Sequence, residues 1–182
     1  MINRLKTIPS EEHNQIESKL FYYLFRTSFW KNAKTIGTTW PKSFEWDTTK
    51  LMETAWLNHK TICIPKSNFK TKQMEFYQIK SKKDIQVGYA NIMEPKIGTT
   101  KKVDRAEIEL LIVPGIIFDP FGYRIGFGGG FYDRYLKNFM NNTVSLASLK
   151  QIIPLIASEP HDVPVQYLIT EKGCMVTKNN HF

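Results

Sequence analysis

The sequence has few cysteines and no long apolar run. These shortages argue against a disulfide-rich, zinc-binding or membrane protein. Its 182 residues include two cysteines, Cys63 and Cys174. They lie far apart in apolar, strand-like contexts, so the spacing suits neither a zinc site nor a disulfide framework, and we expect reduced, buried thiols. No apolar run reaches the roughly 18–20 residues of a membrane helix, and Met1 to Ser10 lack the apolar stretch of a signal peptide. We therefore expect a cytoplasmic protein with no membrane partner.

Acidic residues are also scarce relative to basic ones. The chain has 25 Lys and Arg against 17 Asp and Glu, a formal net charge of +8. This excess attracts anions, so nucleotides, acidic metabolites and nucleic acids are candidate partners. The lysines between residues 66 and 102 are scattered, as on a solvated surface. Because the length fits one globular domain of roughly 100–200 residues, we expect residues 1–182 to form a single domain.

Helical and strand-like segments alternate along the chain. Apolar residues at helical spacing predict helices over 10–30, 48–59 and 131–140. The predicted strands are 35–39, 61–65, 74–79, 109–114, 152–157 and 165–169, with a terminal strand from Gly173 and an irregular segment over 80–102. This order predicts a three-layer α/β domain with a mainly parallel central sheet flanked by helices. Ligands in such folds bind at the carboxyl ends of strands, where the loop after Val113 begins.

That loop is rich in glycine. Five glycines fall within the nine residues 122–130. Backbone N–H groups can turn toward an anion there without interference from a Cβ, the following helix start adds its dipole, and the Arg124 guanidinium can bind two phosphate oxygens. The dinucleotide fingerprint would need glycine or alanine where Phe131 stands, and no Gly-Lys-Ser/Thr completes a P-loop. The loop therefore predicts a phosphate site of another kind, with a purely structural glycine turn as the alternative.

The order of residues through this loop resembles a known signature. Pro114-Gly115-x-x-Phe118-Asp119, followed by Gly122-x-Arg124-x-Gly126-x-Gly128-x-Gly130-x-Tyr132-Asp133-Arg134, is similar to the signature of the 5-formyltetrahydrofolate cyclo-ligase family. Further similarity lies at 30–36, 45–48, 64–66, 94–95 and 161–162. The resemblance implies conversion of 5-formyltetrahydrofolate to 5,10-methenyltetrahydrofolate with ATP and Mg²⁺, releasing ADP and phosphate. It also implies a monomer that acts on a reduced folate, with or without a polyglutamyl tail, and binds no nucleic acid.

The resemblance assigns roles to individual residues as well. Arg124 and Tyr132 would act in catalysis, and Trp40, Glu45 and Tyr132 would hold the folate, since a carboxylate accepts hydrogen bonds from pterin N–H groups and an indole offers an apolar wall. Asp133 and Asp162 would bind Mg²⁺, which prefers oxygen ligands and bridges to phosphates. The residues implied to bind ATP are Arg124, Gly126, Phe127, Gly128, Gly129, Gly130, Phe131, Tyr132 and Asp133.

Three features depart from the family pattern, and two other functions fit the composition. The family begins with a basic helix whose lysine and arginine contact ATP, whereas this sequence starts near the end of that helix, and Arg4 and Lys6 do not align with those contacts. Phe131 stands where tyrosine is frequent, and Gln166 where a second aspartate follows Asp162. The alternatives are a basic nucleic-acid-binding module, for which no binding motif is present, and a sugar-phosphate isomerase on a similar scaffold.

Overall fold

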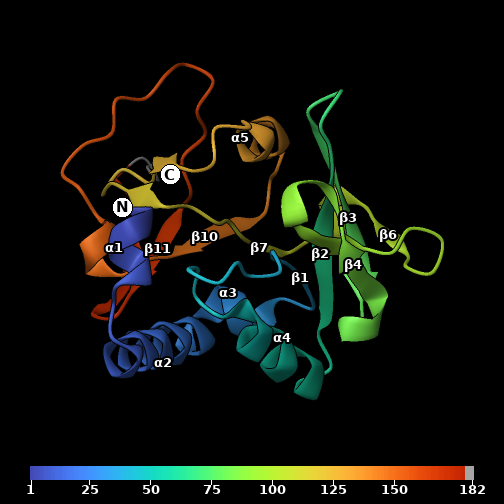
Figure 1. The fold of residues 1–182 in the computed structure, drawn as a ribbon, viewed down its shortest axis with the longest axis horizontal. Coiled ribbons are helices and arrows are strands. Elements are labelled where there is room, and N and C mark those ends of the chain that lie inside the picture. Colours follow the sequence, from blue (N-terminus) through green and yellow to red (C-terminus); the bar gives the residue numbers. More distant parts are fainter. Residues whose placement is uncertain (179–182) are drawn as a thin grey trace.

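The centre of the molecule is an eight-stranded sheet, as the computed structural model, which describes residues 1–178, shows (Figure 1). The strand order is β12-β11-β10-β7-β1-β2-β3-β6. Strands β11, β10, β7, β1 and β2 run parallel, and antiparallel strands complete both edges. The predicted mainly parallel α/β fold is therefore confirmed. The strands of this sheet are β1 (Thr35–Gly37), β2 (Thr61–Asn68), β3 (Gln73–Ile79), β6 (Lys102–Val103), β7 (Leu110–Ile112), β10 (Asn142–Leu146), β11 (Tyr167–Thr170) and β12 (Gly173–Val176).

Helices cover both faces of this sheet. Helices α2 (Ser10–Arg26), α3 (Ser28–Asn32) and α4 (Thr48–Leu57) lie on one face, and α5 (Phe131–Leu136) lies on the other (Figure 1). The short α1 (Ile2–Lys6) precedes them. Strand β7 shows the layering, because Leu110 and Ile112 enter the core under α2 to α4 while Leu111 enters the core under α5. Its continuous apolar run is thus buried on both faces, as expected for a central parallel strand.

Between β1 and β7, the order in which the chain adds strands to the sheet reverses. These neighbours are parallel, with Gly37 beside Leu111. From β1 the chain passes through α4 to β2 on one side, and from β7 it continues to β10 on the other. The loops that follow β1 and β7 therefore separate at the carboxyl edge, which is the place where open α/β sheets bind ligands.

The first predicted helix, 10–30, is two helices. Thr27 is extended (φ −70°, ψ 151°), and its side-chain oxygen accepts a hydrogen bond of 3.2 Å from the N–H of Trp30. Thr27 thereby ends α2 and caps α3. The helical spacing of the apolar residues does not reveal this interruption. The helix predicted over 131–140 ends at Leu136.

The strand predicted over 152–157 is also wrong, and β10 was missed. Residues 142–146 contain Thr143 and Ser145, which weaken the apolar signal, yet both are buried. The Ser145 hydroxyl donates to the Val113 carbonyl at 2.7 Å, so the strand can be buried without an unsatisfied hydroxyl. Residues 152–157 follow the 3₁₀ helix η4 (Leu149–Gln151) and form an irregular segment that makes one isolated bridge, between Ile152 and Phe118.

Smaller differences concern the segment 80–102, strand β2 and the cysteines. The segment predicted as irregular contains the hairpin β4 (Ile85–Val87) and β5 (Met93–Pro95), and β2 continues through Pro65 to Asn68. Both cysteines are free thiols. Only Cys63 is buried, because Cys174 lies exposed on edge strand β12.

Further 3₁₀ helices are η1 (Lys82–Asp84), η2 (Tyr89–Asn91) and η3 (Arg105–Glu107). None of the helices in residues 1–178 has the length and apolar composition needed to span a bilayer.

Candidate functional site

A cavity of about 480 Å³ opens at this carboxyl edge. Its walls come from the loop after β1, the β2–β3 hairpin, the glycine-rich loop and the segment around residues 156–162. The volume is within the range of about 300–1,000 Å³ that is usual for small-molecule sites. All the residues that the sequence assigned to ATP, folate and Mg²⁺ line this one cavity, although up to 122 positions of sequence separate them, from Trp40 to Asp162.

The glycine-rich loop is held in place by a buried aspartate. Strands β8 (Ile117–Phe118) and β9 (Arg124–Ile125) form a hairpin, and Asp119 at its turn is fully buried. One Asp119 oxygen accepts hydrogen bonds of 3.0 Å from the N–H groups of Phe121 and Tyr123, and the other accepts one of 3.0 Å from Ile156. The Phe-Asp of the signature is therefore structural. It ties the hairpin to the segment that carries Asp162.

The tip of this loop leaves its backbone accessible. Gly128 has φ +77°, and a Cβ built there or at Gly126 would meet no atom within 4 Å. Gly130, with φ +62°, begins α5. The left-handed backbone at Gly128 and Gly130 favours glycine, and the open space beside Gly126 and Gly128 permits close approach of an anion to the loop. Because α5 has only six residues, its dipole is small, and the loop amides are the groups that could hold an anion here.

Arg124 and Asp133 form a pair at the base of the loop. The Arg124 side chain is 5% exposed, and its NH2 lies 2.8 Å from Asp133 Oδ1. Its NH1 donates to the Val163 carbonyl at 2.7 Å, and the Val163 N–H donates to the same Asp133 oxygen at 3.3 Å. Burial lowers the pKa of Arg124 while Asp133 opposes that change. An arginine remains charged in proteins, so this pair is a buried ionic link between the loop and the segment before β11.

Tyr132 presents an unsatisfied hydroxyl. Its oxygen is buried and has no hydrogen-bond partner within residues 1–178. Burial raises the pKa of this phenol, and the nearby Glu45 raises it further. The hydroxyl therefore stays protonated, and a buried donor without an acceptor is a position that a bound ligand can satisfy.

Glu45 and Trp40 lie in the loop after β1. The Lys42 N–H donates to Glu45 Oε2 at 2.8 Å, and the Glu45 N–H donates to the Lys42 carbonyl at 3.0 Å, which closes a tight turn. Burial raises the pKa of the Glu45 carboxyl, against the hydrogen bond and charge of Lys42. Trp40 is half-buried against the core and lines the cavity.

Asp133 and Asp162 both border the cavity. Asp162 Oδ2 accepts a hydrogen bond of 2.8 Å from the Glu159 N–H, and Asp162 is near enough to raise the pKa of Arg124. Within residues 1–178 there is no cluster of three His, Cys, Asp or Glu side chains suited to a metal. Two carboxylates fit Mg²⁺ that arrives with a nucleotide, because Mg²⁺ is usually held by one or two carboxylates together with substrate phosphates.

Sequence reasoning missed several residues of the cavity wall. Lys42 lies in the same turn as Glu45, and Phe69 and Met74 come from the β2–β3 hairpin. The position of Lys42 between Trp40 and Glu45 could have drawn attention to it. The hairpin residues gave no comparable signal, because only the fold brings them against the glycine-rich loop.

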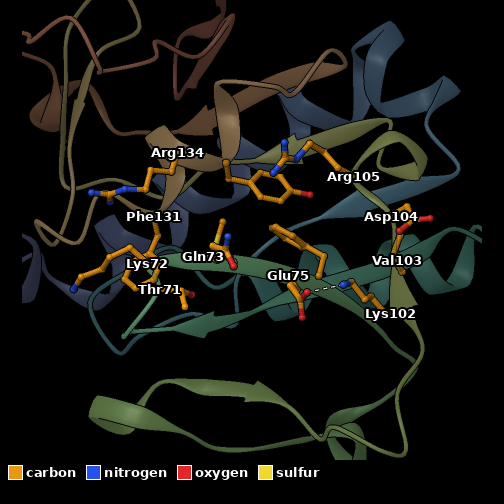
Figure 2. A pocket seen from close by; sticks show the side chains of 13 residues that line it. Thr71, Lys72, Gln73, Glu75, Lys102, Val103, Asp104, Arg105, Phe131 and Arg134 are labelled. Atoms are coloured by element: carbon orange, nitrogen blue, oxygen red, sulfur yellow. Dashed lines mark hydrogen bonds and ion pairs between the residues drawn. The ribbon is translucent and has the colours of Figure 1, made fainter.

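A second pocket, of about 510 Å³, adjoins this cavity and shares Met74 and Phe131 with it. Figure 2 shows Lys102 paired with Glu75 on one side, and Lys72, Phe131 and Arg134 grouped at the other. The Arg105 guanidinium lies 4.5 Å from the centre of the Tyr135 ring, and its Nε is buried without a hydrogen-bond partner in the described part of the chain. The charged side chains lining the pocket are Lys72, Lys102, Arg105, Arg134, Glu75 and Asp104.

Comparison with known proteins gives a consistent result. A sequence model described as the 5-formyltetrahydrofolate cyclo-ligase family matches residues 1–171. The chain is 28% identical over 158 residues to 5-formyltetrahydrofolate cyclo-ligase of Haemophilus influenzae, covering 85% of this chain and 84% of the relative. It is 29% identical over 142 residues to the enzyme of that name from Escherichia coli, with 76% and 78% covered. The solved 5,10-methenyltetrahydrofolate synthetase of Aquifex aeolicus superposes with a TM-score of 0.84 at 29% identity, covering 100% of this chain and 91% of that one.

Proposed function

This chain belongs to the 5-formyltetrahydrofolate cyclo-ligase family, and from that premise we propose that it converts 5-formyltetrahydrofolate to 5,10-methenyltetrahydrofolate using ATP and Mg²⁺, with ADP and phosphate as by-products. The observation that carries the proposal is the shared cavity. It combines an open glycine-rich loop, two carboxylates, and a wall formed by Trp40 and Glu45. The loop and the carboxylates suit a phosphate donor, and the wall of Trp40 and Glu45 suits a flat heterocycle, so one cavity can hold both.

In the proposed reaction the N5-formyl oxygen attacks the γ-phosphorus of ATP. A bond from that oxygen to phosphorus forms as the bond from phosphorus to the ADP oxygen breaks. The N10 lone pair then attacks the formyl carbon, the N10 proton is lost, and the carbon–oxygen bond to phosphate breaks as the ring closes. The enzyme needs to position two substrates and to neutralise phosphate charge rather than supply a nucleophile.

The residues of the cavity suit these tasks. The amides of residues 126–130 would bind phosphate oxygens, with Arg124 fixing the loop in place through Asp133 and Val163. The Tyr132 hydroxyl would donate to a substrate oxygen and so gain the partner that it lacks. Glu45 would accept hydrogen bonds from pterin N–H groups, and Trp40 would contact the ring.

Magnesium would be held by Asp133 and Asp162, and when bound it would neutralise phosphate charge during transfer. Asp133 Oδ1 is already engaged by Arg124 and by the Val163 N–H, so the other oxygen, Oδ2, is the one suited to the metal. Asp133 would thus contact both the metal and Arg124, which holds the glycine-rich loop in place.

The second pocket supports a further detail of the substrate. Folates end in glutamate carboxylates, and this pocket adjoins the cavity with four cationic and two acidic side chains on its walls. We therefore include polyglutamylated 5-formyltetrahydrofolate among the substrates, with its γ-glutamyl tail in this pocket (Figure 2). A triglutamyl substrate should have a lower KM than the monoglutamyl form, and Arg105→Gln should reduce that difference. Equal KM values in the wild type would contradict the tail assignment and leave the reaction itself unaffected.

The remaining proposals concern the state of the protein. We propose a cytoplasmic monomer in which residues 1–182 act as one domain. The single sheet that takes strands from residue 35 to residue 176 supports one domain. Light scattering after size exclusion tests the monomer.

The main experiment follows methenyltetrahydrofolate formation in the near ultraviolet, with and without ATP and Mg²⁺. The wild type should form product only with both. Asp162→Asn should raise the Mg²⁺ concentration needed for half-maximal rate, while Glu53→Gln, a carboxylate change on exposed α4, should not. Turnover without ATP would favour an isomerase, and oligonucleotide binding without turnover would favour a nucleic-acid module.

Arg124→Ala is a poor choice as the only variant. Its guanidinium holds the loop to Asp133 and Val163 from a buried position, so its removal leaves Asp133 without its ionic partner. Breaking a buried pair in this way destabilises a protein by about 3–5 kcal/mol. A loss of product in Arg124→Ala would then report loop disorder as readily as a lost phosphate contact.

A further inference from the structure

Lys42 is a cation of the cavity wall whose charge acts on the Glu45 carboxyl and whose ammonium lies over the Phe127 ring. Its side chain lines the cavity and is half-buried. Within residues 1–178, no carboxylate lies within 4 Å of its Nζ, and Nζ makes no hydrogen bond. Arg124, the other permanent cation of the wall, donates instead to Asp133 and Val163. Lys42 is therefore the wall cation that is available to a ligand.

The backbone of Lys42 is held by hydrogen bonds, whereas its ammonium contacts an aromatic ring. The reciprocal hydrogen bonds with Glu45 hold the residue in its turn. Its Nζ lies 3.6 Å from the centre of the Phe127 ring, at the tip of the glycine-rich loop. The face of an aromatic ring attracts an ammonium group less strongly than a phosphate oxygen does, so an incoming phosphate can displace this contact.

The protein's own side chains leave the cavity wall short of positive charge. Its wall carries Lys42 and Arg124 against Glu45, Asp133 and Asp162, so acidic side chains outnumber permanent cations by one. Without Lys42 the excess would be two. Mg²⁺ arriving with ATP would offset Asp133 and Asp162, and Lys42 would add positive charge for phosphate oxygens that the metal does not hold.

We propose that Lys42 Nζ, from the turn after β1, binds the phosphate oxygens of ATP. Its ammonium leaves the Phe127 ring, contacts the phosphates held by residues 126–130, and offsets the charge that develops on the ADP oxygen as the bond to the γ-phosphorus breaks. This inference rests on the proposed function, because it assumes that ATP is the ligand of the glycine-rich loop.

The test compares Lys42→Met, which keeps length and removes charge, with Lys42→Arg, which keeps charge. Lys19→Met, on the exposed face of α2, is the matched control for loss of one positive charge. Calorimetric titration with a non-hydrolysable ATP analogue and Mg²⁺, without folate, gives Kd, and steady-state assays give separate KM values for ATP and folate. Loss of a hydrogen bond between charged groups predicts a Kd for nucleotide roughly tenfold or more higher in Lys42→Met. Lys42→Arg should lie nearer the wild type, and Lys19→Met should match it.

Two outcomes would overturn the assignment. If Lys42→Met bound nucleotide as tightly as the wild type, Lys42 would not contact phosphate. If it raised the KM for folate as much as the KM for ATP, its effect would come from disturbing the turn that carries Glu45. A wild type that bound no nucleotide would instead refute the proposed function together with this inference, and the variants would not be needed to see it.

Discussion

Glu45 lines the cavity, and its charge is destabilised there by burial. Burial raises the pKa of its carboxyl, so the charged form is disfavoured inside the folded protein. The hydrogen bond from the Lys42 N–H and the charge of Lys42 offset part of this effect. A partly buried acid that faces a cavity, and whose loss of hydration is only partly compensated, is typical of a residue kept for binding rather than for stability.

Glu45→Gln should therefore stabilise the protein and weaken its activity. Because the folded-state pKa is raised, the folded protein binds this proton more tightly than the unfolded chain, and the stability contributed by Glu45 declines as pH rises through the raised pKa. The Tm of Glu45→Gln should exceed that of the wild type by more at about pH 8 than at about pH 4. The kcat/KM for folate should fall roughly tenfold, as expected when a hydrogen bond to a charged group is lost.

Thermal unfolding at the two pH values and steady-state kinetics measure both effects. Glu53→Gln, on the exposed side of α4, is the control and should change neither. A variant with unchanged kcat/KM would show that Glu45 does not contact the folate.

Among the elements, the boundary between α2 and α3 depends on one side chain. Thr27 accepts the Trp30 N–H through its hydroxyl oxygen, and that hydroxyl donates to the Leu24 carbonyl at 2.7 Å. The turn directs Phe29 and Trp30 into the core that lies under β11 and β10. A single helix continued to residue 30 would place these aromatic side chains differently.

Thr27→Ala should lower the free energy of unfolding by about 1 kcal/mol, the usual effect of removing an N-cap side chain. Urea denaturation followed by circular dichroism gives this value. Thr54→Ala is the matched control, because the Thr54 hydroxyl donates within α4 and caps no helix. A destabilisation of Thr27→Ala no larger than that of Thr54→Ala would contradict the capping role.

The accuracy of element prediction followed the strength of the apolar signal. Strand β7 was predicted from its continuous apolar run and the helices α2 and α4 from their periodicity. Strand β10 was missed because Thr143 and Ser145 resemble loop residues. Their burial becomes favourable only when partners such as the Val113 carbonyl are in place. The opposite error occurred at 152–157, whose apolar residues follow η4 without joining the sheet.

For the whole molecule, the positive charge should influence substrate capture. The net charge of +8 attracts anionic substrates over distances comparable to the Debye length, which falls from about 30 Å at 0.01 M salt to about 8 Å at 0.15 M. The second pocket, with its excess of cations, places part of this charge beside the proposed site.

The kcat/KM for ATP and for folate should therefore fall several-fold between these salt concentrations, while kcat changes little. Initial-rate measurements over this range test the expectation, with sucrose at matched osmolarity as a control for non-ionic effects. Constant kcat/KM values would show that the surface charge does not act on substrate capture.

The sequence alone determined the fold class and the location of the glycine-rich loop that borders the cavity. Both depend on local properties: apolar periodicity specifies strands and helices, and closely spaced glycines permit a backbone that approaches an anion. Tertiary structure decided what surrounds the loop. It committed Arg124 to Asp133 and Val163, left Lys42 available over Phe127, and placed a basic pocket beyond Phe131. These are relations between segments far apart in the chain, and they arise only when β1 and β7 become neighbours in the sheet.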